Sequence, residues 1–377
     1  MLLTQPLYCK VPARHLYIHV PFCTRRCSYC DFAIAVRRTV PVDEYLTALS
    51  VELGHARSTN TAPLETVYLG GGTPSRLGVA GVSKLLELVR DGFPIADDAE
   101  VTIEANPEDI SADAVAGWAA AGVNRLSIGI QSFDDNVLRW MHRVHSAEQG
   151  AQAVRDARAG GIENVSVDLI FALPESLDRS WKDDLEKALD LEPDHVSLYG
   201  LTIEPATPVA RWQSRGAVIP ADEERYATDF LLADAMATER DFVHYEVSNF
   251  ARPGKKSRHN SAYWTGAAYM GVGPSAHSYD GSKRRWNVPA YAEWVRRIAA
   301  GESTVEGEEF LTPDNRAAER VYLGLRTVDG FAAAGADLDK AKGWSDSGWA
   351  RVERDVVRLT PEGWLRLDSL ASVLTGF

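Results

Sequence analysis

Short aliphatic and β-branched runs alternate with amphipathic stretches over the first two thirds of the chain. Such runs predict buried strands, and apolar residues spaced three or four positions apart between them predict helices. The predicted strands are Leu16–Val20, Thr66–Leu69, Val101–Ala105, Arg125–Ile130, Val165–Phe171 and His195–Leu201. The predicted helices are Asp43–Ala56, Val82–Asp91, Ala112–Ala121, Ala147–Ala159 and Trp181–Leu191, followed by the helix Asp222–Thr238 and the strand Phe242–Val247.

Six consecutive strand–helix units predict a parallel sheet with right-handed connections, which is an α/β fold. A closed barrel of this type needs eight units, so we expect a partial (β/α)6 barrel. Ligands of such sheets bind at the carboxyl ends of the strands. Candidate site residues should therefore follow the predicted strands.

The rest of the chain divides into two further regions. The barrel takes up residues 1–250, and residues 251–300, rich in glycine, basic and aromatic residues, are predicted to be an ordered excursion that closes the barrel. The segment Gly301–Pro313 is acidic and poor in apolar residues, which predicts a linker. Residues 301–377 form a small C-terminal α+β domain, with helices at Asn315–Leu325 and Pro361–Leu374 and a strand at Val356–Leu359.

Composition limits the class of protein. The chain has 377 residues, 45% of them hydrophobic, and its 53 acidic and 40 basic side chains give a net charge of −13. This is typical of a folded protein large enough to bury a core without disulfides. The acidic balance argues against nucleic acid as the main partner. The sequence shows no export signal and no apolar run near the ~20 residues of a membrane helix, so we expect a cytoplasmic protein.

Three of the four cysteines, Cys23, Cys27 and Cys30, form a C-x3-C-x2-C motif directly after the first predicted strand. In a reducing compartment, clustered cysteines hold a metal more often than they form disulfides. Three thiolates on one loop suit an iron–sulfur cube, whose fourth iron then stays open to a non-protein ligand. The alternative is a zinc site completed by His19 or by a distant histidine. Cys9 stands apart and is predicted to be a free thiol.

This motif and its position resemble the radical S-adenosylmethionine (SAM) superfamily, and further segments resemble its oxygen-independent coproporphyrinogen III oxidase-like group. The matching segments are LYIHVPFC from Leu16, LGGGTPS from Leu69, TIEANPE from Thr102, SIGIQSF from Ser127, DLIFALP from Asp168, ERVYLGLR from Glu319 and RLTPEG from Arg358. The resemblance implies a [4Fe-4S] cluster whose open iron takes SAM, the source of a deoxyadenosyl radical when the cluster is reduced. It also implies a winged-helix-like C-terminal domain that covers the substrate.

By this resemblance, Cys23, Cys27 and Cys30 bind the cluster. The residues implied to bind SAM lie near strand ends: Gly71, Gly72, Thr73 and Glu104 for one SAM, and Gln131, Arg143 and Asp168 where a second SAM can sit. Tyr17 and Tyr29 match aromatic positions beside the cluster. A glycine-rich turn lets the backbone approach a ligand, and a carboxylate can accept hydrogen bonds from a ribose or an amino group. No residue is assigned a catalytic role.

Two functions fit this group. One is an enzyme, a coproporphyrinogen III dehydrogenase that oxidatively decarboxylates propionates, and the other is a heme chaperone of the HemW branch. Three features favour the chaperone: Phe32 stands where the enzymes carry a fourth cysteine, only 22 residues precede Cys23, and His259-Asn-Ser-Ala-Tyr-Trp264 matches the HNxxYW signature of that branch. We therefore predict a heme chaperone without coproporphyrinogen oxidase activity.

The signature also indicates how heme is held. A neutral imidazole is a good axial ligand for heme iron, so His259 is the predicted ligand, and Tyr263 and Trp264 offer flat faces to a porphyrin. The excursion 251–300 is thereby the predicted heme-binding region. Basic residues near the signature could pair with heme propionates: Arg252, Lys255, Lys256, Arg258, Lys283, Arg284 and Arg285. The expected partners are heme and an acceptor protein, for example a respiratory protein at a membrane, with a homodimer left open.

Overall fold

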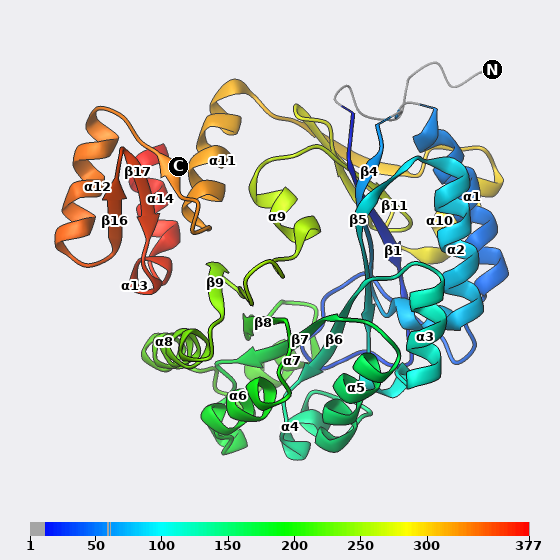
Figure 1. Ribbon diagram of the computed structural model, residues 1–377, viewed down its shortest axis with the longest axis horizontal. Coiled ribbons are helices and arrows are strands. Elements are labelled where there is room, and N and C mark those ends of the chain that lie inside the picture. Colours follow the sequence, from blue (N-terminus) through cyan, green and yellow to red (C-terminus); the bar gives the residue numbers. More distant parts are fainter. Residues whose placement is uncertain (1–11, 59, 61, 377) are drawn as a thin grey trace.

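The computed structural model describes residues 12–58, 60 and 62–376, so Cys9 lies outside the described part. A long curved sheet dominates it, with the strand order β14-β13-β12-β11-β1-β4-β5-β6-β7-β8-β10-β9 (Figure 1). The parallel strands are β11 (Tyr269–Val272), β1 (His15–Val20), β4 (Leu64–Gly71), β5 (Ile95–Ala105), β6 (Arg125–Gln131), β7 (Asn164–Phe171) and β8 (His195–Gly200). Antiparallel strands extend both edges: β12 (His277–Tyr279), β13 (Lys283–Asn287) and β14 (Val305–Phe310) on one, and β10 (Asn249–Ala251) and β9 (Val243–Glu246) on the other.

Most helices lie on the outer side of the curved sheet (Figure 1). They are α1 (Val42–Arg57), α2 (Gly78–Gly92), α3 (Ala112–Ala120), α4 (Asp135–Trp140), α5 (Ala147–Ala159), α6 (Trp181–Asp190), α8 (Glu223–Glu239) and α10 (Tyr291–Ala299). Shorter elements are α7 (Pro208–Ser214), β2 (Phe22–Cys23), β3 (Ala35–Val36) and the 3-10 turns Pro74–Leu77, Pro107–Asp109 and Glu175–Leu177. Helix α9 (Arg258–Trp264) lies on the inner side, opposite β4 and β5. The predicted strands of the parallel sheet and the helices between them are confirmed, with ends that differ by a few residues.

The two faces of the sheet differ in chemistry, and strand β6 shows this most clearly. Leu126, Ile128 and Ile130 are fully buried in the hydrophobic core between the sheet and the outer helices. The alternate residues Arg125 and Ser127 face the inner side and line a cavity. Successive strand residues point to opposite faces, so one strand serves both the core and the cavity.

A small α+β unit follows the large sheet at the opposite end of the molecule from α1 to α3 (Figure 1). Its helices are α11 (Pro313–Leu325), α12 (Ala336–Asp346), α13 (Pro361–Trp364) and α14 (Leu367–Thr375). Its antiparallel sheet has the order β15 (Phe331–Ala332), β17 (Val356–Leu359), β16 (Ala350–Glu353). The helix and strand predicted beyond residue 313 are therefore confirmed, and the predicted C-terminal helix is split in two.

The predicted linker Gly301–Pro313 is wrong. Its central residues, Val305–Phe310, form strand β14, which pairs with β13 at the edge of the large sheet. Its acidic residues lie opposite basic ones, with Glu309 across from Arg284 and Glu308 across from Arg285. Oppositely charged cross-strand pairs stabilise a sheet, and charged residues are usual on edge strands. The acidic composition that favoured a linker is thus that of a paired edge strand.

The prediction that residues 251–300 close the barrel is also wrong. Strand β11 joins the free edge of β1, and the excursion lengthens the sheet on that side. Among the described residues the two outermost strands, β14 and β9, do not pair with each other. The sheet is therefore curved but open. Within the described residues, no helix combines the length and the apolar character that a membrane crossing requires.

The buried Glu52 joins α1 to the excursion. Its carboxylate accepts hydrogen bonds from the Gly273 amide (2.8 Å), Asn287 Nδ2 (2.6 Å) and Trp294 Nε1 (3.1 Å), and from the Thr304 hydroxyl (3.1 Å). Burial raises the pKa of Glu52, and these donors oppose the shift. Because the group is 2% exposed, its removal leaves several buried donors without a partner.

Glu52→Ala is expected to lower the free energy of unfolding by about 3 kcal/mol, because unpaired buried donors keep their desolvation cost. Urea unfolding followed by circular dichroism measures this change. The matched control is Glu87→Ala on α2, whose exposed side chain should contribute less than about 0.5 kcal/mol. Equal stability of the two variants would contradict the role of Glu52.

Candidate functional site

A cavity of about 590 Å³ runs along the inner face of the sheet. At one end it is lined by residues at the carboxyl ends of strands, such as Gly71, Ala105 and Gln131, and at the other by Arg125 and His195, the first residues of β6 and β8. All the residues predicted to bind the cluster, SAM or the heme iron, and the two tyrosines predicted beside the cluster, line this cavity: Tyr17, Cys23, Cys27, Tyr29, Cys30, Gly71, Gly72, Thr73, Glu104, Gln131, Arg143, Asp168 and His259. The structure therefore brings the predicted set together, and their roles toward ligands remain predictions.

The cysteine loop is held in place by backbone hydrogen bonds. The Ser28 amide donates to the Met141 carbonyl at 3.0 Å, and the Ser28 carbonyl accepts from the Val209 amide at 3.1 Å. The Arg37 amide donates to the Cys23 carbonyl at 3.0 Å. The loop is thus fixed between α4, α7 and the segment that follows it.

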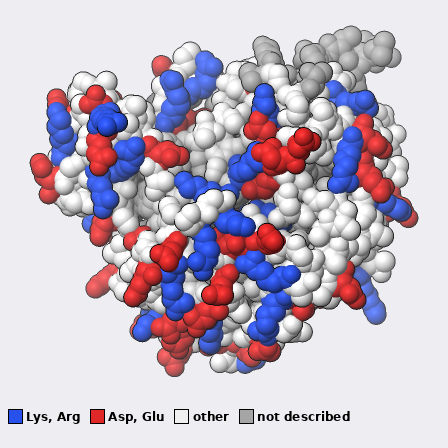
Figure 2. All heavy atoms as spheres, viewed as in Figure 1, with Lys and Arg blue, Asp and Glu red and all other residues white. Residues whose placement is uncertain are grey.

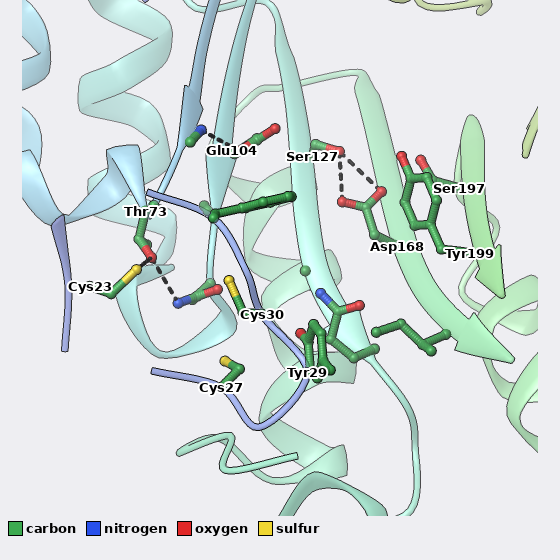
Figure 3. A pocket seen from close by; sticks show the side chains of 18 of the residues that line it. Cys23, Cys27, Tyr29, Cys30, Thr73, Glu104, Ser127, Asp168, Ser197 and Tyr199 are labelled. Atoms are coloured by element: carbon green, nitrogen blue, oxygen red, sulfur yellow. Dashed lines mark hydrogen bonds between the residues drawn. The ribbon is translucent and has the colours of Figure 1, made fainter. Parts of the chain in front are cut away.

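The three sulfurs face one common space (Figure 3). Cys23 Sγ lies 3.4 Å from the Thr73 hydroxyl, and Arg143 Nη1 lies 3.6 Å from Cys27 Sγ. Burial raises the pKa of Cys23 and raises that of Cys30 to about 11. Such thiols keep their protons until a metal ion binds and replaces them.

This donor set fits an iron–sulfur cluster. Three soft sulfur ligands come from one short loop, and the Arg143 guanidinium beside Cys27 offsets the negative charge that bound thiolates carry. His19, the predicted fourth ligand of a zinc site, does not line the cavity. Its ring nitrogens lie 3.0 Å from the Ala33 carbonyl and 3.2 Å from the Tyr17 hydroxyl, so both are engaged elsewhere.

Arg143 connects the cysteine loop to the strand ends. Its Nη2 donates to Asn106 Oδ1 and to the Gly129 carbonyl, both at 2.7 Å. Burial alone would lower its pKa, but nearby Tyr29, Cys27 and Glu108 raise the pKa above its ordinary value. Arg143 therefore stays charged. Its buried Nε has no hydrogen-bond partner among the described residues, which leaves one donor for a ligand.

The glycine turn after β4 is needed for the packing of the chain itself. A Cβ on Gly72 would lie 2.6 Å from the Pro21 carbonyl oxygen, and one on Gly70 would lie 2.9 Å from the Tyr17 ring. Gly71 has a φ of +115° and would place a Cβ 2.6 Å from the His19 ring. Close passage of β4 past β1 thus accounts for these glycines, in addition to the approach of a ligand expected from the sequence.

Glu104 lies at the end of β5 and is held by two donors. Its Oε1 accepts from the Tyr68 hydroxyl at 2.7 Å. Its Oε2 accepts from the Gly71 amide at 3.0 Å, a bond drawn in Figure 3. Burial is the main cause that raises its pKa, to about 7. The carboxyl group is therefore close to half protonated at neutral pH and can donate or accept a hydrogen bond.

Asp168 on β7 is surrounded by serines. Its carboxylate accepts from the Ser127 hydroxyl at 3.0 Å and 3.1 Å (Figure 3). It also accepts from the Ser166 hydroxyl at 3.3 Å. Burial raises its pKa despite these bonds and a further one from Ser197. Gln131 ends β6 in the left-handed region with a φ of 70°, and its side chain lines the cavity.

An aromatic row lines the opposite wall. Tyr17 stacks on Tyr68 with ring centroids 6.0 Å apart, and Tyr68 stacks on His259 at 5.0 Å. Tyr29 instead lies beside Cys27, which contributes to the raised pKa of its phenol, although burial is the larger cause. Tyr29 is thus beside the cysteines, whereas Tyr17 is part of the row.

His259 is 1% exposed, and both of its ring nitrogens are engaged. Nδ1 lies 2.6 Å from the Thr66 hydroxyl and Nε2 lies 2.9 Å from the Tyr263 hydroxyl. Burial lowers its pKa to about 3, so the imidazole is neutral, as an axial ligand must be. Ligation of a metal through Nε2 requires Tyr263 to move away.

The basic residues predicted to meet propionates are mostly paired with carboxylates. Lys255 lies 3.7 Å from Asp194, Arg258 lies 3.3 Å from Asp98, and Lys283 lies 2.8 Å from Glu308. Arg284 pairs with Glu319. On the face drawn in Figure 2, acidic and basic side chains are interspersed. These ion pairs reduce the positive charge that the paired residues can present to an anionic ligand.

Sequence reasoning missed the polar residues inside the strands. Arg125 is 2% exposed, lines the cavity, and its Nε has no hydrogen-bond partner among the described residues. His195 lies nearby, with Nδ1 2.8 Å from the Ser166 hydroxyl and Nε2 2.8 Å from the Tyr245 hydroxyl. The sequence did contain a signal: polar residues occupy most of the alternate positions of β6, β7 and β8, which places them on one face of the sheet.

Comparison with known proteins places these features in a family. Residues 17–188 match the model of the radical SAM superfamily. The chain is 39% identical over 368 residues to the heme chaperone HemW of Mycobacterium tuberculosis, covering 96% of this chain and 94% of that one. The chain belongs to the HemW family. Another HemW, from Bacillus subtilis, is 35% identical over 318 residues, 84% of each chain.

A solved structure shares the fold of this HemW family member. The coproporphyrinogen III oxidase HemN of Escherichia coli matches with a TM-score of 0.80 at 22% identity, covering 98% of this chain and 90% of that one. At this identity the match shows the fold, a mixed α/β architecture with a large, mostly parallel sheet. It does not decide between a chaperone and an oxidase.

Replacement of Cys23, Cys27 and Cys30 by serine is expected to abolish iron and sulfide binding after anaerobic reconstitution, because serine hydroxyls are poor ligands for a cluster. Iron and sulfide assays with the absorption spectrum measure this. Cys9→Ser is the control and should keep both. Retention of iron by the triple variant, or tetrahedral zinc in the unaltered protein, would contradict the cluster.

Glu104→Gln is expected to change how stability depends on pH. Because folding raises the pKa of Glu104 from 4.5 to about 7, its contribution to the free energy of unfolding falls as pH rises between these values. The stability of the protein without ligands should therefore drop relative to the variant by about 1–3 kcal/mol from pH 4.5 to pH 7. Urea titrations at several pH values measure the difference, and a constant difference would refute the shift.

Proposed function

We propose that this chain is a heme chaperone, which binds heme and transfers it to an acceptor protein. The observation that carries the proposal is the similarity to a HemW over nearly the whole of both chains, the signature from His259 to Trp264 included. The same proposal includes three points that rest on the family resemblance alone. They are an acceptor of respiratory type, a cytoplasmic location and a homodimer.

The residues of the first cavity would hold the cofactors. Cys23, Cys27 and Cys30 would bind a [4Fe-4S] cluster, and SAM would be bound by the residues at the strand ends: Gly71, Gly72, Thr73, Glu104, Gln131, Arg143 and Asp168. A reduced cluster with bound SAM supplies radical chemistry. The chain orients the ligand through Glu104, Arg143 and the serine-bound Asp168, and its buried aromatic row keeps water from one wall.

The alternative function is that of a coproporphyrinogen III dehydrogenase. Phe32 occupies the position of the fourth cysteine of such enzymes and is 60% exposed at the mouth of the cavity. A phenylalanine in place of the fourth cysteine supports the chaperone function, as predicted from the sequence. We also propose that the open sheet functions as a partial (β/α)6 barrel, that residues 251–300 contribute the heme site, and that the C-terminal unit is a winged-helix-like cover.

Heme transfer is expected to depend on contact with the acceptor. Hemin-loaded, anaerobically reconstituted protein mixed with an apo-heme protein should transfer hemin at a rate that rises with acceptor concentration, measured by the Soret band. Hemin on serum albumin is the control, since passive release gives a rate independent of acceptor. A concentration-independent rate, or formation of protoporphyrinogen from coproporphyrinogen III with SAM and reductant, would contradict the chaperone.

Two variants test His259 as the axial ligand. His259→Ala should weaken hemin binding at least tenfold and shift the Soret band, because the coordinating nitrogen is lost. Tyr263→Phe removes the hydroxyl that occupies Nε2, and so should bind hemin at least as tightly as the unaltered protein. Hemin titrations compare the two. A Soret band unchanged in His259→Ala would exclude this residue.

A further inference from the structure

A second cavity of about 690 Å³ lies where α9, the β11–β13 strands and α11 meet. Four aromatic residues line it: Tyr263, Trp264, Tyr269 and Tyr279. Its volume is within the range of about 300–1,000 Å³ that is usual for small-molecule sites. Pro313 and Leu323 of α11, the first helix of the C-terminal unit, also line it.

The aromatic residues of this cavity pack against one another and against an arginine. Tyr263 and Tyr269 meet edge to face with centroids 4.7 Å apart, and the Arg326 guanidinium covers the Trp264 ring at 4.6 Å. Trp264 Nε1 is buried and has no hydrogen-bond partner among the described residues. A buried donor left unpaired is costly, and a ligand with an acceptor group would relieve this cost.

Two arginines stand at the mouth of this cavity on one face of α11. Arg316 and Arg320 are four residues apart and exposed, and both line the cavity. Arg316 makes one long contact, 3.5 Å to the Gly281 carbonyl, and Arg320 forms no ion pair or hydrogen bond with the described residues. Arg284, in contrast, is paired with Glu319. Arg316 and Arg320, which form no ion pair with the described carboxylates, therefore lie at the exposed edge of the aromatic cavity.

Tyr263 separates the two cavities, since it lines both. Its hydroxyl lies 2.9 Å from His259 Nε2, so this nitrogen points at the partition. The first cavity is less suited to a large flat ring, because the cysteine loop, Glu104 and Asp168 place thiols and carboxyl groups along it. The second cavity has one lining carboxylate among the described residues, Glu319, and this is paired with Arg284, so the charges of Arg316 and Arg320 remain beside its aromatic faces.

We propose that the second cavity holds the heme, with its porphyrin between the aromatic walls and its two propionates on Arg316 and Arg320. This inference rests on the proposed function and adds a location separate from the cysteine cavity. Aromatic rings stack on a flat π-system, and arginine forms strong paired bonds with carboxylates. His259 reaches the iron from behind Tyr263 once that ring turns away.

The test is hemin titration of the full, anaerobically reconstituted protein. Replacement of Arg316 and Arg320 by alanine should weaken hemin binding 10- to 100-fold. The matched control is Arg211→Ala with Arg215→Ala, an exposed pair with the same spacing at α7 that lines neither cavity. It should bind hemin within twofold of the unaltered protein.

Hemin dimethyl ester, which lacks the propionate charges, should bind the double variant and the unaltered protein alike. A second variant, Ala267→Trp, fills the cavity without removing a charge and should abolish hemin binding while the cluster content and SAM binding are kept. Normal hemin binding by both variants would overturn the proposed location and leave the chaperone function standing. An unaltered protein that binds no hemin would overturn both.

Discussion

The position of the cysteine loop in the first site depends on the contacts of the charged Arg143 guanidinium. Its guanidinium touches Cys27 and is held by Asn106 and the Gly129 carbonyl, so one side chain ties the cysteine loop to the ends of β5 and β6. The loop itself contains little regular structure, only the short strand β2. Its sulfurs therefore keep their places because the parallel sheet presents fixed partners. The position of the cysteine loop is in this sense a property of the whole sheet edge.

Period and order in the sequence were enough to predict six of the seven strands of the parallel sheet, all but β11. Alternating apolar runs and helical stretches have strong local signals, and the strands from β1 to β8 follow them closely. The edge strand β14 could not be recognised in the same way, because its acidic composition is not typical of a strand. Its glutamates lie opposite Arg284 and Arg285 of the neighbouring strand β13. Pairing between charged strands is a tertiary effect that no local pattern contains.

The candidate site was predictable where a motif marked a strand end. The cysteines, Glu104 and Asp168 all line the cavity as expected. Arg125 was missed because site residues were expected at the carboxyl ends of strands, whereas Arg125 is the first residue of β6. The alternation of polar positions along the strand does place Arg125 on the cavity side. The packing role of the glycines could not be predicted from the sequence. Their fit against Pro21 and His19 depends on how closely two strands pass each other, which only the structure shows.

The central claim is that three thiolates hold a cluster with one iron left open. Electron paramagnetic resonance of the reduced, reconstituted protein tests this directly, with SAM added to one of two matched samples. We expect a [4Fe-4S] signal whose g values change when SAM binds the open iron. A cluster signal that SAM leaves unaltered, or the absence of any cluster signal, would contradict the account.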